Sequence, residues 1–149
     1  MSSRREARRT AIDILYQADV TNTDPVDALG GWVDADRRIP TFARELVEGT
    51  AASLVEIDAV LEEHAQDWTV ERMAALDRTI LRVAIYELLH RPDVPHAAAI
   101  SEAVEAAGEL SAEQSRGFVN GILGSIARGL DAPKPKEPAE EQRGGAAGT

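Results

Sequence analysis

The residues of this sequence whose types and spacing best suit chemistry lie close to its start, on a predicted helix over residues 4–20. They are Arg4, Arg5, Arg8, Arg9 and Tyr16. The arginines form two i,i+4 pairs, and by helical angle they share one arc, which the tyrosine continues. Guanidinium groups bind phosphates and an aromatic ring stacks on bases, so the pattern suits RNA. The alternative is a frayed terminus whose arginines are simply solvated.

The overall charge sharpens this interpretation. The chain carries 16 basic and 26 acidic residues, a formal net charge of −10, which argues against a general nucleic-acid binder. Among residues 1–9, however, the arginines are opposed by Glu6 alone. A short basic patch on an acidic body predicts a focused anion site, and the acidic body should repel nucleic acid elsewhere.

The element that must position such a site is a predicted helix over residues 76–90. Its apolar residues cover an arc of roughly 240°, so other helices should enclose it. Glu87 falls inside that arc and needs a buried donor, whereas Asp77 lies in the first turn, where the helix dipole favours a carboxylate. The remaining strip is the only side left for water or a partner. That strip holds Arg78, Thr79, Arg82, Tyr86 and His90.

Apolar periodicity predicts an all-α protein with further helices around this one. They are expected over residues 25–29, 40–64, 69–73, 95–108, and from Ser111 or Ser115 to 130. The helix over 40–64 is expected to be weakened at Gly49, and Thr69 is the expected cap of the short turn through residue 73. Trp68 is interpreted as a core anchor. We expect one helical domain over residues 1–131 and a disordered tail over 132–149, because the Pro-, Lys- and Gly-rich tail cannot bury a core.

The last helix carries three glycines on one side. Gly117, Gly121 and Gly124 each cost roughly 1 kcal/mol of helix stability relative to alanine. Such a cost suggests the close approach of another backbone or of a ligand. Phe118 lies beside them, on the rim of the apolar stripe.

Several function classes are not expected. The chain has no cysteine and three scattered histidines, so neither disulfides nor a metal site is predicted. No glycine loop for nucleotides and no nucleophile motif appears, so we expect no enzyme and no cofactor. The absence of a long apolar run or a secretory signal predicts a soluble cytoplasmic protein without membrane contact.

Taken together, five stretches resemble the NusB family of transcription antitermination factors. The strongest match is Leu-Asp-Arg-x-Ile-Leu-Arg-x-Ala-x-Tyr-Glu-Leu at 76–88. The others, in family order and spacing, are Arg-Arg-x-Ala-Arg-x-x-Ala-x-x-x-Leu-Tyr at 4–16, Asp-Val-Pro at 93–95, Ile-Ser-Glu-Ala at 100–103 and Phe-Val-Asn-Gly-Ile-Leu at 118–123. The resemblance covers residues 4–130 and is weakest over 21–40.

This resemblance implies a fold of about seven helices in two roughly perpendicular three-helix bundles. It implies a factor that binds boxA-type single-stranded RNA together with NusE, a small-subunit ribosomal protein. Such a complex helps RNA polymerase, with other Nus factors, to read through terminators on ribosomal RNA operons. The resemblance also allows a homodimer.

The resemblance assigns roles to particular residues. Arg4, Arg5 and Arg8 match the family's arginine positions, with Arg9 as an additional cation. Gln114 and Phe118 map to the RNA face at the start of the last helix. Asp77 matches an acidic position near the partner and RNA surfaces, and the strip residues Arg78, Arg82 and Tyr86 join it as candidates for partner binding. Two departures are Gln114, where an acid is expected, and Glu6, where a base is common.

Two alternatives remain at this point. The chain is either an RNA-assembly factor or a protein-only interaction module whose arginine helix mediates dimerisation. A third interpretation is the accessory helical domain of an RNA-methylating enzyme, but no methyltransferase domain follows here.

Overall fold

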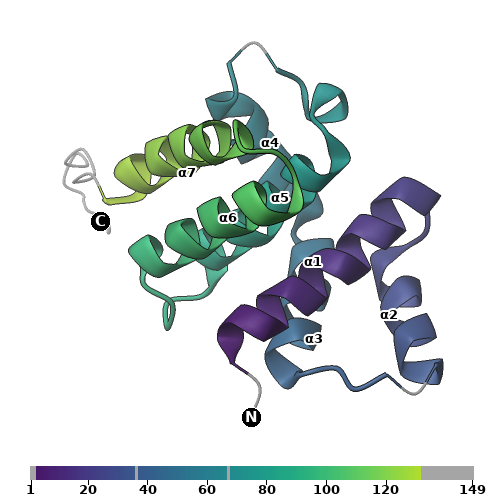
Figure 1. Ribbon diagram of the computed structural model, residues 1–149. Helices are drawn as coiled ribbons and strands as arrows, with labels where there is room; N and C mark the ends of the chain where they lie inside the picture. Colours follow the sequence, from purple (N-terminus) through teal and green to yellow (C-terminus); the bar gives the residue numbers. More distant parts are fainter. Residues whose placement is uncertain (1–2, 36, 67, 132–149) are drawn as a thin grey trace, which may run out of the picture.

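The protein is all-helical in a computed structural model that describes residues 3–35, 37–66 and 68–131. No strand occurs in these ranges, so the predicted fold class is confirmed (Figure 1). The elements are α1 (Arg4–Thr21), α2 (Pro25–Asp34), α3 (Thr41–Ala52), α4 (Leu54–His64), the 3-10 turn η1 (Val70–Arg72), α5 (Ala75–His90), α6 (His96–Leu110) and α7 (Ser115–Asp131). The expected tail at 132–149 lies outside the described residues.

The helices form two groups that share α5. Helices α1, α2 and α3 pack on one another, and so do α5, α6 and α7, while α4 lies against α5 and α7. α5 also contacts α1 and α3, so it joins the two bundles, as its wide apolar arc predicts (Figure 1). Ile80, Leu81 and Ile85 are completely or almost completely buried along it. None of the described helices is long and apolar enough to cross a membrane.

α1 is capped firmly at the end that carries the arginines. The Ser3 hydroxyl accepts a hydrogen bond from the backbone N–H of Glu6 at 3.1 Å, and the Glu6 carboxylate accepts one from the N–H of Ser3 at 3.1 Å. This reciprocal capping box satisfies two N–H groups that a helix start otherwise leaves free. It fixes the first turn, which argues against a frayed terminus, and it gives Glu6 a structural role.

The predicted helix over 40–64 is wrong in one respect, because the chain breaks at Ser53 and forms α3 and α4. α3 packs on α1 and α2, whereas α4 packs on α5 and α7, and one straight helix cannot reach both bundles. Gly49 is not the weak point. A side chain there would collide with the ring of Tyr86, so glycine permits close packing of α3 against α5.

Three smaller boundaries also differ from expectation or resolve an open choice. α2 continues through Gly30 and Gly31 to Asp34. η1 has no side-chain cap from Thr69; instead, the Glu62 carboxylate accepts a hydrogen bond from the N–H of Val70 at 3.2 Å. α7 begins at Ser115, the second of the two predicted starts.

Candidate nucleic-acid interface

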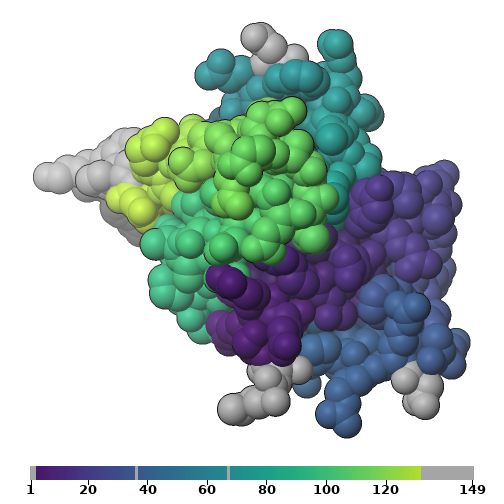
Figure 2. Space-filling view, viewed as in Figure 1, coloured from purple at the N-terminus to yellow at the C-terminus, as the bar shows by residue number. Residues whose placement is uncertain are grey.

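The first two turns of α1 lie against α6 and the end of α5, and we call this contact the α1–α6 seam. It contains the four arginines, paired with Asp93, Glu102, Glu105, Glu87 and Glu109. Figure 2 shows the purple start of α1 packed directly against the green segment of α6. Every arginine that the sequence offers as a phosphate ligand therefore already holds a carboxylate within the chain.

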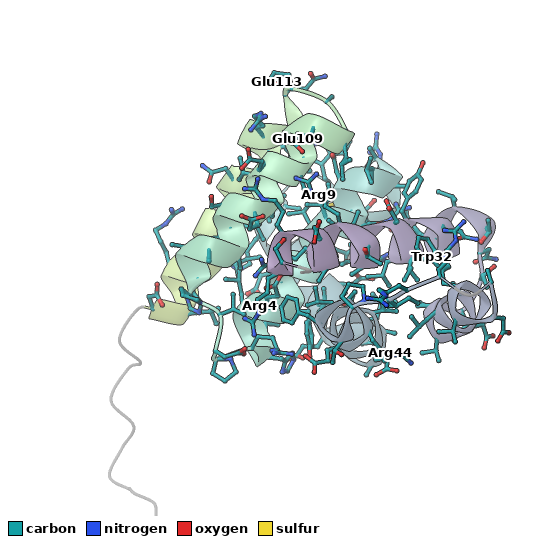
Figure 3. The ribbon with its side chains drawn as sticks, turned by 60° about the horizontal axis from the view of Figure 1, so that its bottom comes forward. Arg4, Arg9, Trp32, Arg44, Glu109 and Glu113 are labelled. Atoms are coloured by element: carbon teal, nitrogen blue, oxygen red, sulfur yellow. The ribbon has the colours of Figure 1, made fainter. Side chains whose placement is uncertain are left out.

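The outer part of the seam is a row of three acids on one face of α6. Arg5 donates to both carboxylate oxygens of Glu102 at 3.1 Å and to Glu105 at 3.0 Å. Arg9 donates to Glu109 at 2.8 Å, and Figure 3 shows these two side chains pointing toward one another. The hydrogen bond to Glu102 raises the pKa of Arg5, and the one from Arg9 lowers the pKa of Glu109. Because Arg5 is half exposed, a phosphate from solvent can reach this row.

Arg8 behaves differently from its neighbours. Arg8 is only 9% exposed, and its guanidinium donates hydrogen bonds to the Glu87 carboxylate at 2.7, 2.9 and 3.1 Å. Glu87 is 1% exposed, so this is the buried donor that α5 requires. The sequence contains a signal that Arg8 is buried, because Arg8 continues the helical stripe of Ala11, Ile12 and Leu15, all of which are buried.

The start of the seam rests on an aromatic ring of α3. Arg4 lies 4.3 Å and Arg91 5.0 Å from the centroid of the Phe42 ring, within the range of cation–π attraction. Asp93 accepts hydrogen bonds from both guanidiniums. The bonds from Arg91 and then Arg4 hold the pKa of that carboxyl well below its usual range. Arg4 is thus oriented as well as charged.

The predicted aromatic and amide contacts lie toward the other end of α5. The pairs Arg8–Glu87 and Asp19–Arg78 show that α1 and α5 run antiparallel. Tyr16, on α1, is 38% exposed and lies two turns beyond Arg9 on the same face. Gln114 is exposed in the turn before α7. Phe118 is partly buried, with its ring packed edge-on against Trp68 at a centroid distance of 6.3 Å.

The four candidates for partner binding are largely engaged within the chain. Arg78 donates to Asp19 and to the carbonyls of Val70 and Met73. Arg82 donates to both oxygens of Asp58 at 2.8 Å. Asp77 accepts from the Ser115 hydroxyl at 3.1 Å, which ties the start of α7 to the start of α5. Tyr86 packs on Gly49 and on the ring of His90.

Comparison with known proteins shows which family this helical architecture belongs to. The family model described as "NusB family" matches residues 5–128, which is most of the chain. The chain belongs to the NusB family. It is 43% identical to the transcription antitermination protein NusB of Acidothermus cellulolyticus, over 94% of this chain and all of that protein. It is 48% identical to that of Saccharopolyspora erythraea, over 85% of this chain and 88% of that protein.

Solved structures agree with this membership. The T. maritima NusB structure is similar with a TM-score of 0.77 and 32% identity, over 85% of this chain and 92% of that one. A crystal structure of antitermination factors NusB and NusE in complex with dsRNA is similar with a TM-score of 0.75, over 85% of this chain and 96% of that one. Its 24% identity shows the fold alone. Family membership makes the chain a transcription antitermination factor of the NusB type.

Two features of this NusB-family chain escape sequence reasoning. Trp68, predicted as a core anchor, is 48% exposed, so that prediction is wrong. It lies in the connection between α4 and η1, where its ring meets the edge of the Phe118 ring of α7 but stays about half exposed. The acid row was also missed, although Glu102, Glu105 and Glu109 recur at i, i+3 and i+7 along the edge of a buried alanine stripe. No cluster of three metal-ligating side chains occurs within the described ranges.

Proposed function

We propose that this chain binds boxA-type RNA together with NusE, and that the complex promotes read-through of ribosomal RNA operons as part of the elongating RNA polymerase assembly with other Nus factors. It would act by assembly, without catalysis of its own. NusB-family membership supports this proposal, and so does the similar crystal structure of NusB and NusE in complex with dsRNA. The observation that carries it is the exposed face of α1, where Arg5, Arg9 and Tyr16 follow one another in a line.

The seam suggests how phosphates bind. An RNA phosphate replaces Glu102, Glu105 or Glu109 as the partner of Arg5 and Arg9, so binding is an exchange of anions rather than the filling of an empty site. Arg4 contributes from its place above Phe42, while Arg8 remains with Glu87. Binding falls as salt rises because phosphate contacts release counterions. Tyr16 and Phe118 stack on unpaired bases, and Gln114 offers an amide to a base edge.

NusE would occupy the exposed parts of the strip on α5. Arg78 is bound to Asp19 and Arg82 to Asp58. We therefore propose that these ion pairs form part of the surface that NusE contacts, and that the two arginines do not donate new hydrogen bonds to NusE. Asp77 links the two faces, since its bond to Ser115 places the start of α7 relative to α5. NusE binding at one face can therefore strengthen RNA binding at the other, and this coupling must be reciprocal.

The deciding experiment is a titration of labelled boxA RNA at two salt concentrations, with and without NusE. Arg5→Gln should weaken binding by about 5- to 20-fold. It should also reduce the slope of log affinity against log salt by about one. Arg44→Gln is the matched control, because it removes the same charge from an exposed residue of α3. Figure 3 shows Arg44 apart from the Arg9–Glu109 pair.

Two other outcomes would redirect the interpretation. Equal affinity for Arg5→Gln and the wild type would remove the seam from the RNA site. If the wild type binds no RNA even with NusE, and is a dimer that Arg5→Gln dissociates, the arginine helix is a dimer interface.

The titration also includes a double-stranded form of the RNA, because the similar complex contains dsRNA. Stronger binding of the single strand is expected if stacking contributes.

A further inference from the structure

Trp68 is a large aromatic side chain that the fold leaves half in solvent. It stands two residues after Gln66, whose φ of 57° is left-handed, in the connection from α4 to η1. Its ring meets that of Phe118 edge to face, with an interplanar angle of 73°, and the Arg72 guanidinium lies 6.0 Å from its centroid. A tryptophan that serves only packing is usually covered, whereas an exposed aromatic beside a cation is typical of a stacking surface.

A groove opens beside this tryptophan, which we call the Trp68 groove. It has a volume of about 450 Å³, within the range of ligand sites. Trp68 and Phe118 form one side, and α7 contributes Gly121, Ser125 and Arg128. No carboxylate among the described residues lines it, although the chain as a whole carries a net charge of −10. In such an acidic protein, a groove with aromatic and cationic lining favours an anionic, aromatic ligand.

The glycines of α7 supply an independent observation. The sequence suggests that they admit a close neighbour, yet a side chain at Gly117 or Gly121 would meet no described atom within 4 Å beyond its chain neighbours and the adjoining backbone of α7. Packing within the described chain therefore does not require glycine at either position, despite the cost to the helix. Space kept open on the helix face that borders the groove is what an external ligand needs.

We propose that Trp68 stacks on an unpaired base of the same RNA strand that passes Phe118, and that Arg72 and Arg128 contact the flanking phosphates. The inference rests on the proposed function and extends the RNA path from the start of α7 to the α4–η1 connection. The perpendicular rings cannot stack on one base together, so each takes a different nucleotide. The His64 ring, which also lines the groove and is hydrogen-bonded to the Ser125 hydroxyl at 2.9 Å, offers a polar group to a base edge.

Fluorescence tests this directly, because the chain contains two tryptophans. The Trp32→Phe variant leaves Trp68 as the sole tryptophan, and single-stranded boxA RNA should quench its emission in a saturable way. In addition, Trp68→Ala should lower RNA affinity about 5- to 100-fold, as expected for the loss of one stacked base. Trp68→Phe should recover most of that loss, since it restores an aromatic face. Thermal melting of each variant checks that it folds.

The outcomes separate this inference from the function on which it rests. If the wild type binds no RNA, both fail. If the wild type binds, Arg5→Gln weakens binding, and neither quenching nor a Trp68→Ala effect appears, the base site is overturned and the function stands. If Trp68→Ala reduces NusE binding while RNA affinity without NusE is unchanged, the groove serves the protein partner, and the assignment to RNA is wrong.

Discussion

The α1–α6 seam and the Trp68 groove differ in how their charges are paired, and our proposals give each a different way to bind RNA. The seam holds four arginines, and each is bound to a carboxylate of α5, α6 or the loop between them. The groove holds fewer charges, but no described carboxylate lines it. The difference teaches that the number of cations on a surface does not measure how much charge is free. On our proposals, RNA displaces internal anions in the seam, whereas no carboxylate of the described groove lining has to be displaced.

The same comparison applies within the seam itself. Arg5 pairs in solvent, where an ion pair contributes little to stability, and its carboxylates can be exchanged. Arg8 pairs in the core, where removal of either partner leaves a desolvated charge. Two arginines three residues apart on one helix thus differ: Arg8 is held in the core, whereas Arg5 stays available for the proposed binding of phosphate.

The largest expected effect breaks the buried pair. Glu87→Ala leaves the Arg8 guanidinium without a partner and should lower the free energy of unfolding by about 3–5 kcal/mol, measured by urea denaturation. Glu109→Ala, which removes the exposed partner of Arg9, is the matched control and should cost at most about 1 kcal/mol. A loss below 1 kcal/mol for Glu87→Ala would mean that Arg8 turns out to solvent, and Arg8 would return to the set of phosphate ligands.

A smaller effect concerns the acid row. The double substitution Glu102→Gln with Glu105→Gln frees Arg5 and should raise RNA affinity about 2- to 5-fold, the worth of exposed ion pairs. Glu48→Gln with Asp34→Asn removes two exposed acids from α3 and α2 and is the control for overall charge. An equal gain in both double variants would show that the acid row acts only through net charge, and the exchange mechanism would be abandoned.

The smallest effect tests the groove. Gly121→Ala adds a methyl group that meets no described atom beyond the adjoining backbone of α7, so it should stabilise α7 by up to about 1 kcal/mol in urea denaturation. If a base occupies the groove, the same methyl group should weaken RNA binding slightly, so stability and affinity change in opposite directions. Gly30→Ala, on α2 and equally open, should gain stability without a change in affinity. Unchanged RNA affinity for Gly121→Ala would place the strand away from α7.

Much of the fold follows from local pattern. The wide apolar arc of residues 76–90 predicts a central helix because burial on most sides leaves no alternative, and α5 does join both bundles. The continuous pattern over 40–64 fails to reveal the break at Ser53. Period alone does not say which bundle each half must reach, no proline marks the site, and Ser53 forms no side-chain cap hydrogen bond even though Ser53 and Glu56 have the spacing of a capping box. Residue types near 68 likewise predict burial of a tryptophan that the connection leaves exposed.

The features of the candidate site likewise fall into those that the sequence predicts and those that only the tertiary structure shows. The sequence by itself determined the all-helical class, the placement of the arginines and Tyr16 on one helix, and the need of Glu87 for a donor, because each depends on angles within one helix. Only the tertiary structure decided that Arg8 is that donor, that the α6 acids hold Arg5 and Arg9, and that Trp68 meets Phe118. These contacts join residues far apart in the chain. Which side chains meet across such distances is set by how the helices pack, and helical period within one segment carries no information about that.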